Sequence, residues 1–174
     1  MSQKLQEILS EINLSLAQLT HEIEKLIFVS PRAAMQTTRT MTETLVRQVA
    51  QMEGLEHSEL TFGEVQMKLK NEGIITSKTD DAIHFVRRQG NIASHDGTRK
   101  MLIREALTCW ENQHLILTWF IETYASPNIE VPEYIEPVPE KSASNSEDLI
   151  EHIEALMQTL MQKPRVPENN VTEQ

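Results

Sequence analysis

Cysteine, glycine and aromatic residues are scarce in this chain of 174 residues. The single cysteine, Cys109, cannot form an intramolecular disulfide or a cysteine-based zinc site, and it suits a reducing compartment. Five glycines and 5% aromatic residues, beside many Leu, Ile, Met, Gln and Glu, favour helix over sheet. Apolar residues make up 39%, which is enough for a core. The expected fold class is therefore all-α.

Long apolar runs and targeting signals are also missing. Residues 1–20 lack the charged start and the continuous apolar segment of a signal peptide. The longest apolar stretches, Leu26–Val29 and Leu115–Ile121, are far too short to span a bilayer. We therefore expect a cytoplasmic protein with no membrane partner.

The familiar catalytic motifs are absent as well. The sequence contains no GxxxxGK[ST], GxGxxG, GxSxG or HExxH. Of its six histidines only His84 and His95 share a helix face, three turns apart, which is too far for one metal ion. No paired carboxylates fall in an obvious cleft. A conventional metalloenzyme or nucleotide hydrolase is disfavoured, and we expect neither a metal nor a cofactor.

Charge is unevenly distributed along the chain. The net charge of −10 argues against a protein that coats DNA without sequence preference, because the affinity of such a protein comes from neutralising phosphates. Between His84 and Arg104, however, five basic residues face a single acid, Asp96. Such a local cationic patch can accept a phosphate group or a short nucleic-acid segment.

The apolar spacing predicts an up-and-down bundle of about five helices within residues 1–125. In the first helix, residues 2–29, apolar residues repeat at four-three spacing, and this face packs along the bundle or against a second copy. The second begins with Ser30 as N-cap and Pro31 at the first position, and stops at Gly54. The third covers about 60–71, and the fourth runs from near Ser77 or Thr79 to just before Gly97.

The fifth helix, about 98–125, is apolar nearly all round and should be the central one. We expect Leu115, Leu117, Phe120 and Ile121 to be buried, and its aromatic residues to belong to the core rather than to a ligand-stacking site. Residues 126–145 hold four prolines and read as an extended linker. An amphipathic helix, 146–162, follows and docks on the bundle, on a second copy or on another protein. We expect residues 163–174 to be disordered.

One stripe of polar residues stands out on the fourth helix. His84, Arg88, Asn91 and His95 follow at spacings of four, three and four, so at about 100° per residue they share one narrow face. Apolar residues occupy the opposite side. Arg32, Arg39 and Arg47 of the second helix are expected on a solvated face; the alternative is that Arg39 or Glu43 is buried near this site. The alternative role of the stripe is structural, since Asn91 and His95 near a helix end can simply hold the next loop.

A histidine beside an arginine and an asparagine is the minimum for metal-independent RNA cleavage. The 2′-hydroxyl must lose a proton, the leaving oxygen must gain one, and the phosphate must be stabilised. Histidine performs both proton transfers, and arginine contacts phosphate oxygens through its two-pronged fork. One histidine per chain suffices if two chains bring their stripes together across a two-fold axis.

The run FVRRQGNIASHDG, residues 85–97, carries a family resemblance. Together with FVSPRAAMQTTRTMTETL and GL…LKNEGII before it and AL…WFIETY after it, it resembles a helical domain of uncharacterised function in bacteria. That domain is found alone and at the front of type I restriction-enzyme motor subunits, and belongs to the HEPN superfamily (higher eukaryote and prokaryote nucleotide-binding). The resemblance covers about Glu22 to Tyr124. It implies a helical dimer related to endoribonucleases of toxin–antitoxin, abortive-infection and CRISPR systems.

The sequence departs from the superfamily motif at one position. Active members usually carry arginine, a polar residue and, a few residues later, histidine. When Asn91 is aligned with the polar position of the motif and His95 with its histidine, Gly90 occupies the position of the arginine. With six intervening residues Arg88 meets the motif instead, and it shares the stripe with His95, whereas Arg87 lies roughly 80° away. Arg88 is thus the better phosphate candidate and Arg87 the better structural one.

Two functions follow as hypotheses. The first is a HEPN-like homodimer of a bacterial defence or stress system, such as anti-phage or restriction-associated systems, that binds RNA and can cleave it without metal. Its catalytic candidates are His95, Arg88 and Asn91, with Arg87, His84, Arg99 and Lys100 as further RNA contacts. The second is a catalytically silent module that docks onto a restriction or defence complex through its acidic surface or the helix at 146–162.

Overall fold

The computed structural model describes residues 3–125, 128–139 and 146–162, and within these ranges the chain is helical with no strand. The predicted all-α class is therefore confirmed. No helix in these ranges is long and apolar enough to cross a bilayer. The helices in the described ranges are α1 (Gln3–Ile12), α2 (Leu14–Val29), α3 (Pro31–Met52), α4 (Phe62–Asn71), α5 (Ser77–His95), α6 (Ile103–Tyr124) and α7 (Ser146–Gln162).

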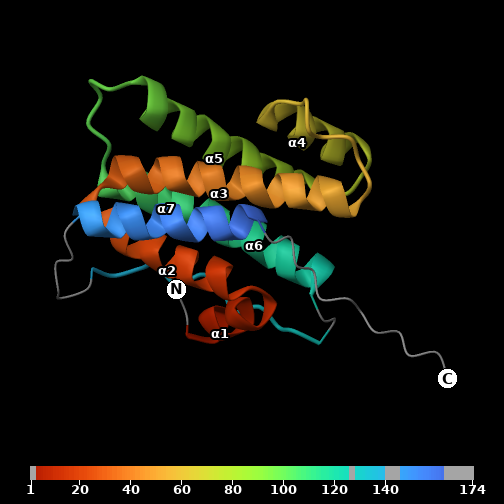
Figure 1. Ribbon diagram of the computed structural model, residues 1–174, viewed down its shortest axis with the longest axis horizontal. Helices are drawn as coiled ribbons and strands as arrows, with labels where there is room; N and C mark the ends of the chain where they lie inside the picture. Colours follow the sequence, from red (N-terminus) through yellow and green to blue (C-terminus); the bar gives the residue numbers. More distant parts are fainter. Residues whose placement is uncertain (1–2, 126–127, 140–145, 163–174) are drawn as a thin grey trace.

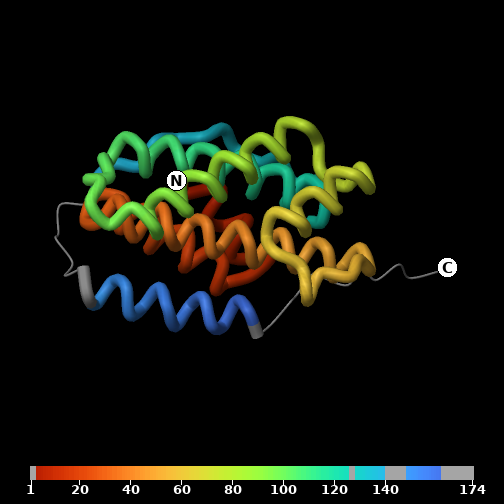
Figure 2. Tube along the Cα trace, turned by 90° about the horizontal axis from the view of Figure 1, so that it is seen from above, coloured from red at the N-terminus to blue at the C-terminus, as the bar shows by residue number. Residues whose placement is uncertain are grey.

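The helices α2, α3, α5 and α6 form the body of an up-and-down bundle (Figure 1). Helix α3 is the central element, because it packs against α2, α4, α5, α6 and α7. The short helix α4 lies at one end, against α3 and α5 (Figure 1). Helix α7 runs along the outside of the bundle, where it contacts α2 and α3 (Figure 2).

The expected single helix over residues 2–29 is wrong, because the chain breaks at Asn13. This residue is extended, with φ −159° and ψ 109°, and its side chain accepts a hydrogen bond from the backbone N–H of Leu16 at 3.1 Å. Asparagine is among the best N-cap residues, so it begins a new helix here. Helix α1 packs against α2, and Gln6 donates to the carbonyl of Ala17 at 2.7 Å. The apolar face of both helices lies in the chain's own core.

The next three helix boundaries follow the sequence closely. Helix α3 has Pro31 in its first turn and is followed by Gly54 with φ +67°, although the Ser30 side chain makes no capping hydrogen bond. Helix α4 begins at Phe62, two residues later than expected, because Thr61 and Glu64 form a capping box. Helix α5 is capped by Thr76, just before the predicted start.

Helix α6 begins at Ile103 rather than near Thr98. The preceding residues form a turn, and Glu105 accepts a hydrogen bond from the Leu102 backbone N–H at 2.9 Å. Leu117, Phe120 and Ile121 are buried as expected, whereas Leu115 is only half-buried, so that part of the prediction is wrong. Trp110, Trp119 and Phe120 are buried in the core, and Tyr124 packs against it.

Polar and sulfur groups also lie inside the bundle. The Trp110 indole donates to the Glu24 carboxylate at 2.8 Å, joining α6 to α2, and Thr42 of α3 bonds Gln113 of α6. Buried polar groups with such partners specify which helices lie next to each other. The Cys109 thiol is buried, and burial raises its pKa to about 12, which makes it a poor nucleophile.

The segment after α6 follows the bundle instead of leaving it. Residues 128–139 are non-helical, and Ile129, Val131 and Tyr134 pack against the core. Helix α7 packs on the bundle of its own chain and buries Leu149, Ile153, Leu156, Met157 and Leu160 there. Met161 was expected on this face but is 55% exposed. The predicted disorder of 163–174 lies outside the described residues.

Replacing Ile153 by alanine tests the docking of α7. Its side chain is 2% exposed, so the variant should lower the free energy of unfolding by about 2–5 kcal/mol in urea denaturation. Met161→Ala on the same helix is the matched control and should cost much less, because that side chain is largely in solvent. Equal, small losses in both variants would show that α7 does not pack on the bundle.

Candidate functional site: a polar stripe on α5

The polar stripe predicted on α5 exists as one face of a continuous helix. Val86 and Ala93 on the other side are buried, which fixes the rotation of α5 in the bundle. His84, Arg88 and His95 are exposed and Asn91 is half-buried. We call these four residues the polar stripe.

Two members of the polar stripe carry side chains with unused hydrogen-bonding capacity. In the described part of the chain, the side chains of Arg88 and His95 make no hydrogen bond and no ion pair. They lie seven positions apart in the sequence, which is two helical turns or about 10 Å along the axis. Exposed arginines on an acidic protein commonly pair with carboxylates, so an arginine that has none is available to an anion from outside.

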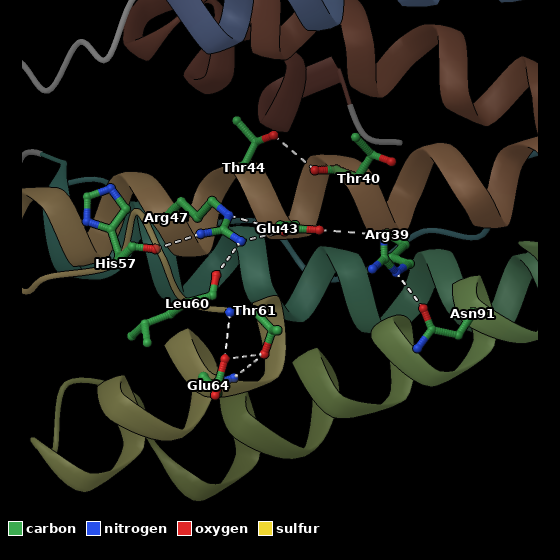
Figure 3. Close-up of polar contacts among 10 residues, drawn as sticks. All are labelled: Arg39, Thr40, Glu43, Thr44, Arg47, His57, Leu60, Thr61, Glu64 and Asn91. Carbon is green, nitrogen blue, oxygen red and sulfur yellow. Dashed lines mark hydrogen bonds and ion pairs between the residues drawn. The ribbon is translucent and has the colours of Figure 1, made fainter.

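Asn91, between them, is held from α3. Its side-chain oxygen accepts a hydrogen bond from Arg39 Nε at 2.8 Å (Figure 3). The Arg39 Nη1 atom lies 3.5 Å from a Glu43 carboxylate oxygen, and its guanidinium carbon lies 5.7 Å from the centre of the Phe62 ring. Arg39 was predicted on a solvated face or, alternatively, buried near the site; it is half-buried beside Asn91, and Glu43 is half-buried next to it.

Gly90 creates the space that Arg39 uses. A Cβ atom at position 90 would lie 2.4 Å from Arg39 Cβ, 2.7 Å from Cδ and 2.9 Å from Cγ. No side chain can occupy that position without displacing the stem of Arg39 or separating α3 from α5. Gly90 therefore has a packing role.

Arg47 is the structural counterpart of Arg39 on the same helix. Its Nε and Nη2 atoms bond Glu43 at 3.1 and 2.9 Å, and it donates to the backbone carbonyls of His57 and Leu60 at 2.9 Å (Figure 3). It thereby fixes the loop before α4. A hollow of about 400 Å³ lies beside it, lined by Thr40, Glu43, Thr44, Arg47, Gln48, Gln51, His57 and Met161.

Arg87 and His84 lie at the α4 end of the stripe. Arg87 Nη2 lies 3.2 Å from His84 Nδ1, and a Cβ at position 63 would meet Arg87 Nη1 at 2.9 Å, so its guanidinium rests on Gly63 of α4. Its Nε is buried without a partner among the described residues. Both side chains line a hollow of about 260 Å³. Lys70 and Asp80, which form an ion pair, line it as well. Arg87 is half-buried, in line with the structural role expected for it.

The other end of the stripe is fixed by donors from α3. Arg32 bonds the carbonyls of Ala93 and Arg99, and Gln36 donates to the same Ala93 carbonyl at 3.2 Å. Asp96 accepts from the Thr98 hydroxyl and the Arg99 backbone, which holds the pKa of its carboxyl below the ordinary value. The Arg99 side chain pairs with Glu105, whereas Lys100 is exposed and makes no such contact within the described ranges.

The structure thus divides the sequence-predicted residues into two groups. Arg88, Asn91 and His95 form one surface, while Arg87 and Arg99 are engaged in contacts within the fold. Arg32 was missed because its carbonyl partners lie more than sixty residues away in the sequence. A glycine in the interior of a predicted helix was the available signal that another chain segment approaches α5 at Gly90.

Comparison with known proteins assigns the chain to a family. Residues 21–165, most of the chain, match the family described as a domain of unknown function (DUF4145), and the chain belongs to that family. The match extends across α7, beyond the bundle proper. No curated protein and no solved structure matches the chain.

Gly90→Ala tests the close approach of α3 and α5. In the wild-type background the added methyl group overpacks against the Arg39 stem, so we expect the free energy of unfolding to fall by about 1–3 kcal/mol. In an Arg39→Gly background the same change should raise it by about 0.5–1 kcal/mol, because alanine is the better helix former. Urea denaturation of the four proteins measures both effects. The same sign in both backgrounds would refute the packing role of Gly90.

Proposed function

We propose that this protein is a HEPN-like module that binds RNA through the polar stripe. The observation that carries the proposal is the pair formed by Arg88 and His95, which are exposed and without partners in the described residues, on either side of a fixed Asn91. A structural network would have used these donors internally, as Arg47 and Arg32 do. Here the fold anchors Asn91 and leaves the Arg88 and His95 side chains on either side of it available.

A phosphate is the ligand that suits this surface best. Arginine matches two oxygens of a phosphate through parallel N–H donors, and asparagine adds a neutral donor beside it. With a net charge of −10, the rest of the surface repels a polyanion, so binding is confined to the local cationic face. The surface therefore favours a short single-stranded segment over an extended duplex.

The same residues support cleavage when two chains bring their stripes together. One His95 takes the proton of the ribose 2′-hydroxyl, whose oxygen attacks the adjacent phosphorus. The bond from phosphorus to the 5′-oxygen breaks, and His95 of the second chain gives that oxygen its proton. Arg88 stabilises the charge on the phosphate oxygens. The products are a 2′,3′-cyclic phosphate and a free 5′-hydroxyl, without a metal ion in the step.

The resemblance to HEPN domains supports the homodimer and the setting in a bacterial defence or stress system. The competing hypothesis is a catalytically silent docking module. One of the two surfaces that it would use is already occupied, because the apolar face of α7 is covered by the chain's own bundle. That hypothesis retains only the acidic surface, while the polar stripe favours RNA.

Arg88→Ala against Arg87→Ala tests the binding face. Both remove one positive charge from neighbouring positions, but only Arg88 is free of contacts within the described structure. We expect Arg88→Ala to weaken binding of a fluorescent single-stranded RNA about tenfold and to reduce the log–log salt slope by about 0.7. Arg87→Ala should change affinity less and stability more. The opposite order in anisotropy titrations would exclude the polar stripe as the RNA contact.

His95→Ala tests the chemistry. Because no other described side chain on the stripe can transfer the proton at that position, cleavage should fall by about 10²–10⁴-fold, with folding unchanged by circular dichroism. Wild-type cleavage should yield a cyclic phosphate, continue in EDTA and accompany a dimeric mass in light scattering. Cleavage that requires a divalent metal, or that His95→Ala retains, would rule out this mechanism. RNA binding without any cleavage by a folded dimer would leave the protein as a binding module.

A further inference from the structure

The polar stripe borders a second guanidinium group, which comes from another helix. Resting on the RNA-binding function above, we propose that Arg39 is a phosphate-contacting residue of the stripe, presented from α3 through the space at Gly90. Three observations carry this proposal: the confinement of the Arg39 stem, the bonding of its head group, and the contrast with the other arginines of α3.

The stem of Arg39 is confined where α3 crosses α5. Its Cβ, Cγ and Cδ atoms all fall within 3 Å of the place that a side chain at position 90 would occupy. The guanidinium is therefore directed past α5 toward Asn91, and its rotamer is fixed before any ligand arrives. Such prior ordering lowers the entropic cost of binding.

The head group of Arg39 is only partly used. Nε donates to Asn91 at 2.8 Å and Nη1 faces Glu43 at 3.5 Å, whereas Nη2 has no partner in the described ranges. The side chain as a whole is 28% exposed, so the head group is not closed off from solvent. Glu43 lies closer to Arg47, at 2.9 Å, than to Arg39, at 3.5 Å. It therefore neutralises the charge of Arg39 less completely than that of Arg47.

The other two arginines of α3 differ from Arg39 in their contacts, and this difference distinguishes a phosphate-contacting role from a structural one. Both terminal nitrogens of Arg32 and both of Arg47 donate to backbone carbonyls. Arg39 bonds no carbonyl; its Nε–H holds the one stripe residue that is not exposed. Arg39 and Arg88 thus flank Asn91 and offer two guanidinium groups to one RNA backbone. Asn91 positions Arg39, and Arg39 in turn keeps Asn91 in place.

Arg39→Gln and Arg39→Lys test the proposal in the full-length chain. For a labelled single-stranded RNA we expect Arg39→Gln to weaken binding about ten- to a hundredfold and to lower the salt slope, because one charge-assisted contact is lost. Arg39→Lys should keep the slope and part of the affinity. Arg47→Gln, on the same helix, and Lys4→Gln, on distant α1, are the matched controls for stability and for charge, and both should bind RNA nearly as wild type.

A second measurement on the wild-type protein separates this proposal from the RNA-binding function. The Arg39 Nε–H signal in a ¹⁵N–¹H spectrum, assigned by its loss in Arg39→Lys, should shift on titration with inorganic phosphate. If phosphate shifts this signal but wild type binds no RNA, the phosphate site stands and the RNA-binding function fails. If wild type binds RNA while both Arg39 variants match it and phosphate leaves the signal unmoved, the role of Arg39 is overturned. Equal losses in Arg39→Gln and Arg47→Gln would likewise overturn it.

Discussion

The packing of α3 against α5 at Gly90 is the constraint on which the site depends. Because position 90 has no side chain, the two helices approach until the Arg39 stem fills the gap. That approach sets where the Arg39 guanidinium ends, and through its hydrogen bond it sets the orientation of Asn91. The core and the surface chemistry are therefore joined at a single crossing. Arg32 and Gln36 extend the same connection to the end of α5, so one helix, α3, positions the whole face.

Helix boundaries were predictable where a residue acts through its own backbone. Pro31 and Gly54 mark helix ends that depend only on local dihedral preferences, and the structure places them there. The start of α6 was not predictable in this way, because it depends on Glu105 accepting from Leu102 and pairing with Arg99. Asn13 is a different case. Its capping preference is local, but the regular apolar spacing across residues 2–29 favoured a continuous helix.

The stripe could be predicted from spacing alone, since helical periodicity places residues on faces. What spacing cannot show is which members remain free. Arg99, predicted as an RNA contact, pairs with Glu105, while Arg39, fifty-two residues before Asn91, bonds Asn91 directly. Such pairings arise from how helices cross, and a single sequence contains no direct record of the crossing. The family match gives the extent of the domain, residues 21–165, but assigns it no activity.

Two arginine side chains, from α3 and α5, pack on the short helix α4, and this has a consequence for local stability. Arg39 lies over Phe62 and Arg87 rests on Gly63, consecutive residues in the first turn of α4. Short peripheral helices open at lower free energy than the global unfolding of a domain. Each local opening of α4 would remove the Phe62 contact of Arg39 and the Gly63 contact of Arg87 together, while Arg39 keeps its hydrogen bond to Asn91. The amide hydrogen-exchange rates of this ten-residue helix would then report how often the two guanidinium groups lose these α4 contacts at once.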